Sequence, residues 1–180
     1  MIEALFQMDG QLLLAIQNTR MDWLDPVVAV YTKLGDAGLL WIGLSALMLC
    51  WKPTRKAGLL ALLAMALGML VTNVTVKPLV ERPRPWLDWP ILPLVAEDDP
   101  HSFPSGHTCA AFAAGMVWLR ALPWRWGRAA AVVMAVCMGL SRLYAGVHYP
   151  SDVLAGGIIG ALCAWVVWKI WNIHQKRINS

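Results

Sequence analysis

Charged residues are scarce in this sequence. Asp, Glu, Lys and Arg together make up 14% of its 180 residues, whereas a soluble globular domain carries about 25%. A water-facing surface of ordinary size cannot be built from so few charges, and soluble helices also need a polar face. A large soluble helical core is therefore not the expected structure, although apolar residues account for 58% of the chain.

Cysteine patterns that hold metals or disulfide frameworks are missing as well. The four cysteines stand apart inside apolar stretches, with no C-x-x-C pair and no Cys/His spacing: Cys50, Cys109, Cys137 and Cys163. We expect buried, unreactive thiols rather than zinc ligands or disulfide partners. A cleavable signal peptide is not expected either, because Glu3 stands where such a signal carries basic residues.

The chain has five long apolar segments instead. They cover residues 37–51, 57–76, 106–122, 129–147 and 152–171. A helix needs about 20 residues to cross the hydrocarbon core of a bilayer, and these segments reach or approach that length. The sequence therefore predicts an all-α fold: a polytopic membrane helical bundle with five transmembrane helices. We expect a single domain over residues 1–180, with its functional bundle in residues 35–172.

Residues 1–34 have a different pattern. Apolar residues there are mixed with polar ones such as Gln7, Asp9 and Gln11, which is typical of an amphipathic helix lying in the membrane interface. Asp22 and Pro26 then open a second short helix that continues to Leu34. Alternatively, one of these two pieces spans the bilayer, which gives six transmembrane helices.

The charges that are present are divided between the two ends of the predicted helices. Nine basic residues and no acidic ones fall on one side: Lys52, Arg55, Lys56, Arg120, Arg125, Arg128, Lys169, Lys176 and Arg177. All eleven acidic residues fall on the other side. Because cytoplasmic loops carry an excess of Lys and Arg, the pattern predicts a cytoplasmic C-terminus. Residues 77–105 and 142–151 then face the periplasm or the cell exterior.

Three short segments on the outer side hold the unusual residues, and the first contains two separated cations. Lys77 follows the second apolar segment, and Arg84 stands seven residues later. Arginine matches phosphate oxygens in a bidentate fashion, although a lone basic pair often only contacts lipid headgroups. We expect Arg82 and Glu81 to be solvated or paired with each other, outside the site.

The second segment opens the third predicted helix with Pro104, Ser105, Gly106 and His107. The free N–H groups of a helix start bind anions, and Ser105 can add a hydroxyl donor. His107 can protonate a leaving oxygen from this position. The alternative for these residues is an ordinary helix cap with an incidental histidine.

The third segment joins the fourth and fifth predicted helices and contains Ser141, Arg142, His148 and Asp152. Pro150 fits the first position of the last helix, so Asp152 lies in its first turn, four residues after His148. A carboxylate so placed accepts one ring N–H and leaves the other nitrogen free as a nucleophile. The alternative is an interfacial histidine beside a helix-capping aspartate.

Together the three segments supply cations, backbone donors, two histidines and a carboxylate, which suffice for in-line phosphoryl transfer without a metal. The pattern resembles the three-part signature of the type 2 phosphatidic acid phosphatase, or lipid phosphate phosphatase, superfamily: K-x6-R-P, P-S-G-H and S-R-x5-H-x3-D. The sequence matches every position between residues 77 and 152.

The resemblance implies a role for each matching residue. His148 is the nucleophile that forms a phosphohistidine, Asp152 is its partner, and His107 is the general acid. The phosphate ligands that it implies are Lys77, Arg84, Ser105, Gly106 and Arg142. No metal or other cofactor is expected, and the expected partners are a lipid phosphate or diphosphate and membrane lipids, without nucleic acid.

Short bacterial members of this superfamily include undecaprenyl diphosphate phosphatases, which recycle the cell-wall carrier lipid. The acidic loop of residues 96–99 is similar to that subgroup, whereas Gly106 departs from the Asp that several of its members carry. Undecaprenyl diphosphate is therefore the expected substrate, in a bacterial cytoplasmic membrane. Phosphatidylglycerophosphate, phosphatidate and lipid A are the alternatives, as is transfer of the phosphate to another lipid. The pattern leaves the oligomeric state open.

Overall fold

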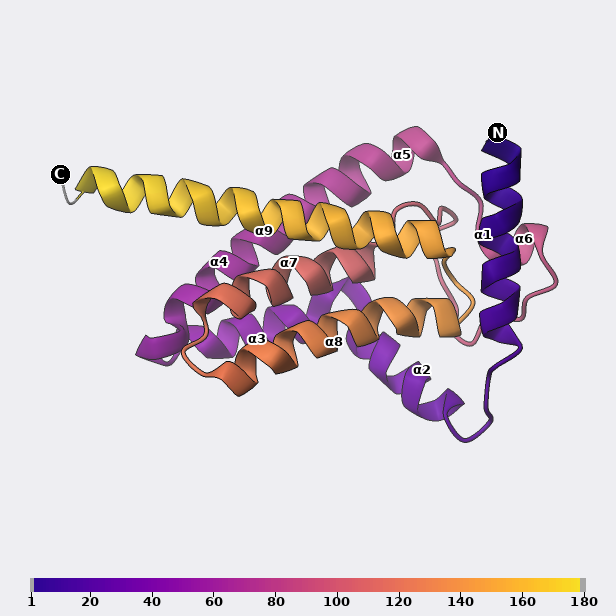
Figure 1. Ribbon diagram of the computed structural model, residues 1–180, viewed down its shortest axis with the longest axis horizontal. Coiled ribbons are helices and arrows are strands. Elements are labelled where there is room, and N and C mark those ends of the chain that lie inside the picture. The colour runs from indigo at the N-terminus through magenta and orange to yellow at the C-terminus, as the bar shows by residue number, and fades with distance from the viewer. Residues whose placement is uncertain (1, 179–180) are drawn as a thin grey trace.

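A computed structural model describes residues 2–178, and the long elements in that range are all helices (Figure 1). No strand occurs there, and the only sheet-like pairing is one isolated bridge between Pro83 and His101. The predicted all-α fold is confirmed.

Each of the five apolar segments lies mainly within helical structure. In chain order the helices are α1 (Ile2–Gln17), α2 (Asp25–Leu34), α3 (Leu39–Leu49), α4 (Lys52–Met69), α5 (Lys77–Val80), α6 (Pro85–Asp88), α7 (Gly106–Ala121), α8 (Arg125–Tyr144) and α9 (Pro150–Ile178). A 3₁₀ turn, Asp36–Gly38, joins α2 to α3, and a π-helical stretch, Leu70–Val76, joins α4 to α5.

Fewer helices than predicted are long enough to cross a membrane alone. Three helical segments have the length and composition to do so: Lys52–Val80, Arg125–Tyr144 and Pro150–Ile178. The pair of α2 and α3, bent by 51°, makes a fourth if it counts as one span. The first predicted span, residues 37–51, holds helix α3, which has only 11 residues, so a span at this place would include α2 as well. Helix α7 has 16 residues, fewer than the roughly 20 of a typical span.

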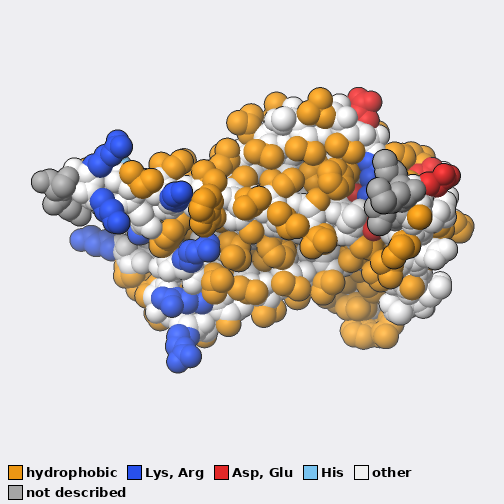
Figure 2. Space-filling model, turned by 45° about the horizontal axis from the view of Figure 1, so that its top comes forward, with side chains coloured by type: hydrophobic (Ala, Val, Ile, Leu, Met, Phe, Trp, Pro, Cys, Tyr) orange, Lys and Arg blue, Asp and Glu red, His pale blue; other side chains and the backbone are white. Residues whose placement is uncertain are grey.

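The surface of the middle of the molecule is apolar, as Figure 2 shows on one face. Large side chains that a soluble helix would bury point outward on α8 and α9, among them Val133, Leu140, Leu154 and Leu162. This surface identifies a membrane protein. It also corrects one expectation, because Cys50 and Cys137 are exposed and only Cys109 and Cys163 are buried.

The two ends of the molecule carry opposite charges. Lys and Arg side chains gather at the end where the C-terminus of α9 lies, and Asp and Glu side chains are seen at the other end (Figures 1 and 2). The turns between α3 and α4 and between α7 and α8 lie at the basic end, as the sequence predicts.

Helix α7 forms the centre of the bundle and packs against α4, α8 and α9. Its approach to α9 is close because α9 presents glycines. A Cβ atom on Gly156 would lie 2.4 Å from the carbonyl oxygen of Ser105, and one on Gly160 would lie 2.3 Å from that of Cys109. Small residues allow helices to pack this tightly, and this contact brings the start of α7 against the start of α9.

Helix α1 lies across the acidic end of the bundle, beside the ends of α8 and α9 (Figure 1). It buries Leu13 in a small cluster with Ile91, Leu143 and Tyr149, whereas Met8 and Leu12 remain exposed. This amphipathic arrangement agrees with a helix that lies along the membrane interface.

We predict that Gly156→Ala and Gly160→Ala destabilise the protein by about 1–3 kcal/mol, the usual cost of overpacking. The new methyl group would overlap a backbone oxygen that cannot rotate away. Thermal unfolding in detergent measures the effect. Gly157→Ala is the matched control, because its Cβ would lie 3.6 Å from Phe112; equal melting temperatures for all three variants would contradict the prediction.

Candidate active site

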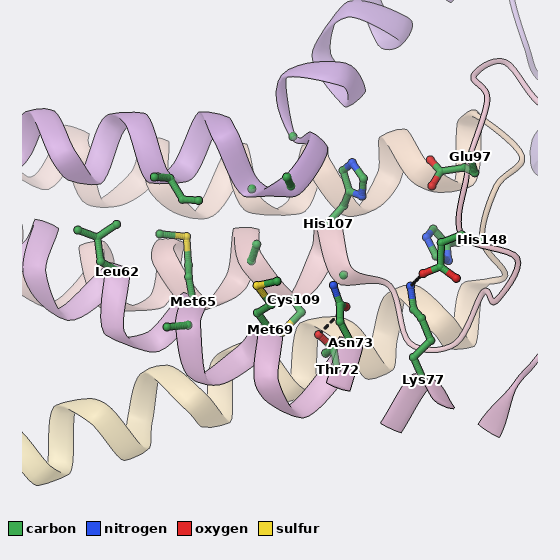
Figure 3. A pocket seen from close by; sticks show the side chains of 18 of the residues that line it. Leu62, Met65, Met69, Thr72, Asn73, Lys77, Glu97, His107, Cys109 and His148 are labelled. Atoms are coloured by element: carbon green, nitrogen blue, oxygen red, sulfur yellow. Dashed lines mark hydrogen bonds and ion pairs between the residues drawn. The ribbon is translucent and has the colours of Figure 1, made fainter. Parts of the chain in front are cut away.

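A cavity of about 450 Å³ lies among α3, α4, α7 and the loops of the acidic end. Its inner part is lined by apolar side chains, including Ile42, Leu62 and Met65. Its other end is polar, and Figure 3 shows Lys77, His107 and His148 there, with Glu97 beside them. The cavity therefore joins an apolar channel to a cluster of ionisable groups.

One wall of this cavity is formed by residues spaced four apart: Met65, Met69, Asn73 and Lys77. In a regular α-helix each four-residue step rotates the side chain by about 40° beyond a full turn. The π-helical stretch has wider turns, which offset this drift and keep Asn73 and Lys77 on the cavity side. Such stretches occur frequently at functional sites.

The cavity is lined by five of the eight predicted site residues: Lys77, Arg84, Gly106, His107 and His148. The other three lie directly behind its wall and are buried: Ser105, Arg142 and Asp152. All eight are thus gathered at one end of the bundle, although residues 77 and 152 are far apart in sequence.

His148 lies between Asp152 and Arg84. Its Nδ1 is 3.5 Å from a carboxylate oxygen of Asp152 without forming a hydrogen bond, and its Nε2 is 3.2 Å from the Arg84 guanidinium. A guanidinium can only donate, so Nε2 must carry the lone pair and Nδ1 the hydrogen. This assignment follows from the partners, and it makes Nε2 the nitrogen available for nucleophilic attack.

The surroundings of His148 also keep it neutral. Burial lowers the pKa of His148 well below its ordinary value of 6.5, and the charges of Arg84 and Arg142 lower it further. The side chain is 2% exposed. A neutral imidazole is the form that can act as a nucleophile.

His107 has a carboxylate partner that the sequence analysis did not identify. Its Nε2 lies 2.9 Å from Oδ1 of Asp36, which belongs to the 3₁₀ turn between α2 and α3. The carboxylate can accept a hydrogen bond from this nitrogen, which fixes the orientation of the ring at the edge of the cavity. No local pattern marks this pair, because 71 residues separate its members.

The start of α7 has a side-chain cap and backbone N–H groups that face no acceptor in the described part of the chain. The Ser105 hydroxyl accepts a hydrogen bond from the N–H of Thr108, and the Ser105 N–H donates to the carbonyl of Asp152 at 3.1 Å. The N–H groups of Gly106 and His107 have no acceptor within residues 2–178, which leaves them available to an anion.

Arg82 differs from the expectation that it pairs with Glu81 or is solvated. Its guanidinium bridges Asp9 of α1, at 2.7 Å, and Asp152, at 2.6 Å. It also lies over the ring of Tyr149, while Glu81 is exposed. Arg82 therefore orients the Asp152 carboxylate beside His148 and links α1 to the start of α9 through two ion pairs.

Glu97 is a site residue that the sequence analysis missed. One of its carboxylate oxygens is 3.2 Å from Arg84, and the other contacts Arg142. Arg142 also donates to the hydroxyl of Thr32. Burial alone would raise the pKa of Glu97, but the charges of Arg142 and Arg84 hold that pKa below its usual range.

Asp99, on the same loop, holds the remaining cation. Its carboxylate lies 2.5 Å from Lys77, and its backbone carbonyl accepts a hydrogen bond from Arg84. Burial opposes ionisation of Asp99, but the hydrogen bonds from Lys77 and from the His101 N–H lower its pKa. Two carboxylates of one loop thus form ion pairs with all three cations of the predicted site, Lys77, Arg84 and Arg142.

Comparison with known proteins identifies relatives over most of the chain. A family model described as the PAP2 superfamily matches residues 57–176. An undecaprenyl-diphosphatase from Sulfolobus acidocaldarius is 29% identical over 133 residues, which is 73% of this chain and 63% of that protein. The chain therefore spans less than two thirds of that relative's length.

Two further relatives match nearly the whole chain. A lipid A 4'-phosphatase from Bacteroides thetaiotaomicron is 28% identical, and the match covers 100% of this chain and 84% of that protein. The crystal structure of a PAP2-type phosphatidylglycerolphosphate phosphatase from Bacillus subtilis is similar, with a TM-score of 0.76 and 32% identity. The match covers 94% of this chain and 87% of the Bacillus chain.

We predict that His148 remains unprotonated when the pH falls from 8 to about 6, because its pKa lies well below 6.5. The unfolded chain binds this proton more readily than the folded protein does, so His148 contributes stability above pH 6.5 that is lost as the pH falls below it. Ring ¹⁵N chemical shifts in detergent, assigned by comparison with His148→Asn, measure the protonation. A His148 resonance that titrates near pH 6.5 would refute the burial argument.

Proposed function

Because the chain belongs to the PAP2 superfamily, we propose that it is an integral-membrane phosphatase that removes a phosphate from a lipid phosphate or diphosphate. The observation that carries this proposal is the cavity, which joins His107, His148, Lys77 and Arg84 to an apolar channel. A lipid with a phosphate at its end matches this distribution of polarity: the chain fits the channel and the phosphate fits the cations.

The reaction would proceed in two steps. In the first step, Nε2 of His148 attacks phosphorus in line with the leaving oxygen, the P–O bond breaks, and His107 gives its proton to that oxygen. In the second step, water attacks the phosphohistidine, His107 takes the proton, and free phosphate leaves as His148 is restored. Asp152 stabilises the positive charge on the His148 ring during both steps.

The cations and the start of α7 would stabilise the charge that develops on phosphorus. Lys77 and Arg84 reach the equatorial oxygens from the cavity wall, and the N–H groups of Gly106 and His107 approach from the helix start. Arg142 is bound to Glu97 and could add a further contact to the phosphate once that carboxylate moves. Within residues 2–178 the hydrogen bonds of the Ser105 hydroxyl both come from Thr108, so its own hydrogen can be donated to phosphate.

Undecaprenyl diphosphate is the substrate that we favour, with undecaprenyl phosphate as the product. The undecaprenyl-diphosphatase among the relatives supports this choice, as does the acidic loop of residues 96–99. Phosphatidylglycerophosphate, phosphatidate and lipid A are the competing lipids, in agreement with the names of the other two relatives. A phosphotransferase would use the same phosphohistidine, and it would release no free phosphate without an acceptor.

We further propose that the protein crosses a bacterial cytoplasmic membrane five times, with the bent α2–α3 pair and α7 included. The site then faces outward and the C-terminus lies in the cytoplasm. The basic end of the molecule in Figure 2 supports this orientation. An outward site suits a substrate presented in the outer leaflet.

We predict that the purified protein releases phosphate from a panel of undecaprenyl diphosphate, phosphatidylglycerophosphate, phosphatidate and lipid A without an added acceptor, most rapidly from the first. His148→Ala should abolish release on every substrate, by at least about 10⁴-fold, because it removes the nitrogen that the proposed first step uses to attack phosphorus. Phosphate release is the measurement, and a wild-type melting temperature shows that the variant is folded. Turnover by His148→Ala would exclude the phosphohistidine, and a different preferred lipid would correct the substrate.

The proposed orientation predicts opposite labelling of two introduced cysteines. In a background with Cys50 and Cys137 replaced by Ser, a membrane-impermeant maleimide should label Asp98→Cys on intact spheroplasts. Lys176→Cys should be labelled only after permeabilisation, because the basic residues that remain at that end keep the C-terminus in the cytoplasm. Both positions are exposed; labelling of Lys176→Cys on intact spheroplasts would reverse the topology.

A further inference from the structure

The Glu97 carboxylate lies among the cations that the proposed function assigns to the substrate's phosphate. It lies between the guanidinium groups of Arg84 and Arg142, and it lines the cavity beside His148 (Figure 3). Its side chain is 13% exposed. A carboxylate bound between two arginines reproduces the contacts that a phosphate makes.

Glu97 lies between the cavity and Arg142. The Arg142 side chain is fully buried and does not line the cavity. Glu97 lines the cavity and also contacts Arg142. The Nε atom of Arg142 has no hydrogen-bond partner within the described part of the chain. A phosphate can therefore bind Arg142 only when Glu97 has moved away.

The charges of the site decide which groups can displace Glu97. The carboxylates of Glu97 and Asp99 offset two of the three positive charges on Lys77, Arg84 and Arg142. A phosphodiester carries one negative charge, so exchanging it for Glu97 gains no Coulomb energy. A phosphate monoester or a diphosphate carries two or more and gains from the exchange.

We propose that Glu97 is a specificity-determining residue, whose carboxylate fills the phosphate site of the free protein and yields only to groups with two or more negative charges. The proposal rests on the proposed function and deepens it. It explains how a phosphatase surrounded by phospholipids keeps their phosphodiester headgroups out of its site. The Glu97 carboxylate competes with incoming phosphates for the two arginines, and removing its charge allows singly charged phosphodiesters to bind.

Direct binding of small anions tests the proposal without requiring turnover. The probes are inorganic phosphate and dimethyl phosphate, a diester with one charge, at about pH 8, well above the second pKa of a phosphate. Calorimetry on the full chain in detergent compares wild type with Glu97→Gln. The control is Asp98→Asn, which removes an exposed charge from the same loop.

Glu97→Gln should bind inorganic phosphate at least about tenfold more tightly than wild type, because one charge-assisted competitor is lost. It should also bind dimethyl phosphate, which wild type and Asp98→Asn should not bind measurably. Phosphate should raise the melting temperature of Glu97→Gln more than that of wild type. Unchanged affinities, or loss of phosphate binding in Glu97→Gln, would overturn the proposal and leave Glu97 a structural partner of the arginines.

A second variant keeps the test decisive if Glu97→Gln does not fold. Glu97→Asp retains the charge but is too short to bridge both arginines, so it should bind phosphate a few times more tightly than wild type; equal or weaker binding counts against the proposal. Arg84→Ala distinguishes a failure of the proposed phosphate site from a failure of the proposed role of Glu97. If wild type binds phosphate no better than Arg84→Ala, the proposed phosphate site itself fails, whereas a difference there with no effect of Glu97→Gln refutes only the role of Glu97.

Discussion

Positive charge held away from water is the constraint on which the acidic end of this molecule depends. Arg84 and Arg142 are 1% and 0% exposed, and an unpaired buried charge costs several kcal/mol. The loop before α7 therefore folds inward, so that Glu97 can lie between them. Arg82 imposes a similar requirement on α1 and α9, whose carboxylates it binds. The ion pairs of these arginines thus fix the conformation of the irregular segments at this end of the molecule.

The parts that the sequence predicts correctly rest on local rules. Pro150 marks the start of α9 and Ser105 caps α7, because each residue has a strong preference for that position. The long uncharged segments predict helices because a bilayer leaves the backbone few alternatives. The spacing of the three motifs predicts which residues meet, since it belongs to a shared family pattern rather than to any one helix.

The parts that the sequence does not predict depend on distant pairings or on which face of a helix meets lipid. Glu97 is 45 residues from Arg142, and no periodicity connects them. The expectation that Arg82 is solvated or paired with Glu81 fails because its partner Asp9 lies in α1, 73 residues away. Cys137 was expected to be buried because apolar residues surround it in sequence; composition alone does not distinguish a lipid-facing side from a protein-facing one.

The π-helical stretch between α4 and α5 makes the site sensitive to the geometry of one helix as well as to its residues. Seven residues in its wider turns rotate the chain about as far as six residues of a regular α-helix would, so the stretch accommodates one additional residue. A regular α-helix over the same Leu70–Val76 would carry Lys77 about 100° around the axis, away from the wall that it shares with Met65. Straightening this one segment would remove Lys77 from the proposed phosphate site while leaving every residue of the three motifs in place.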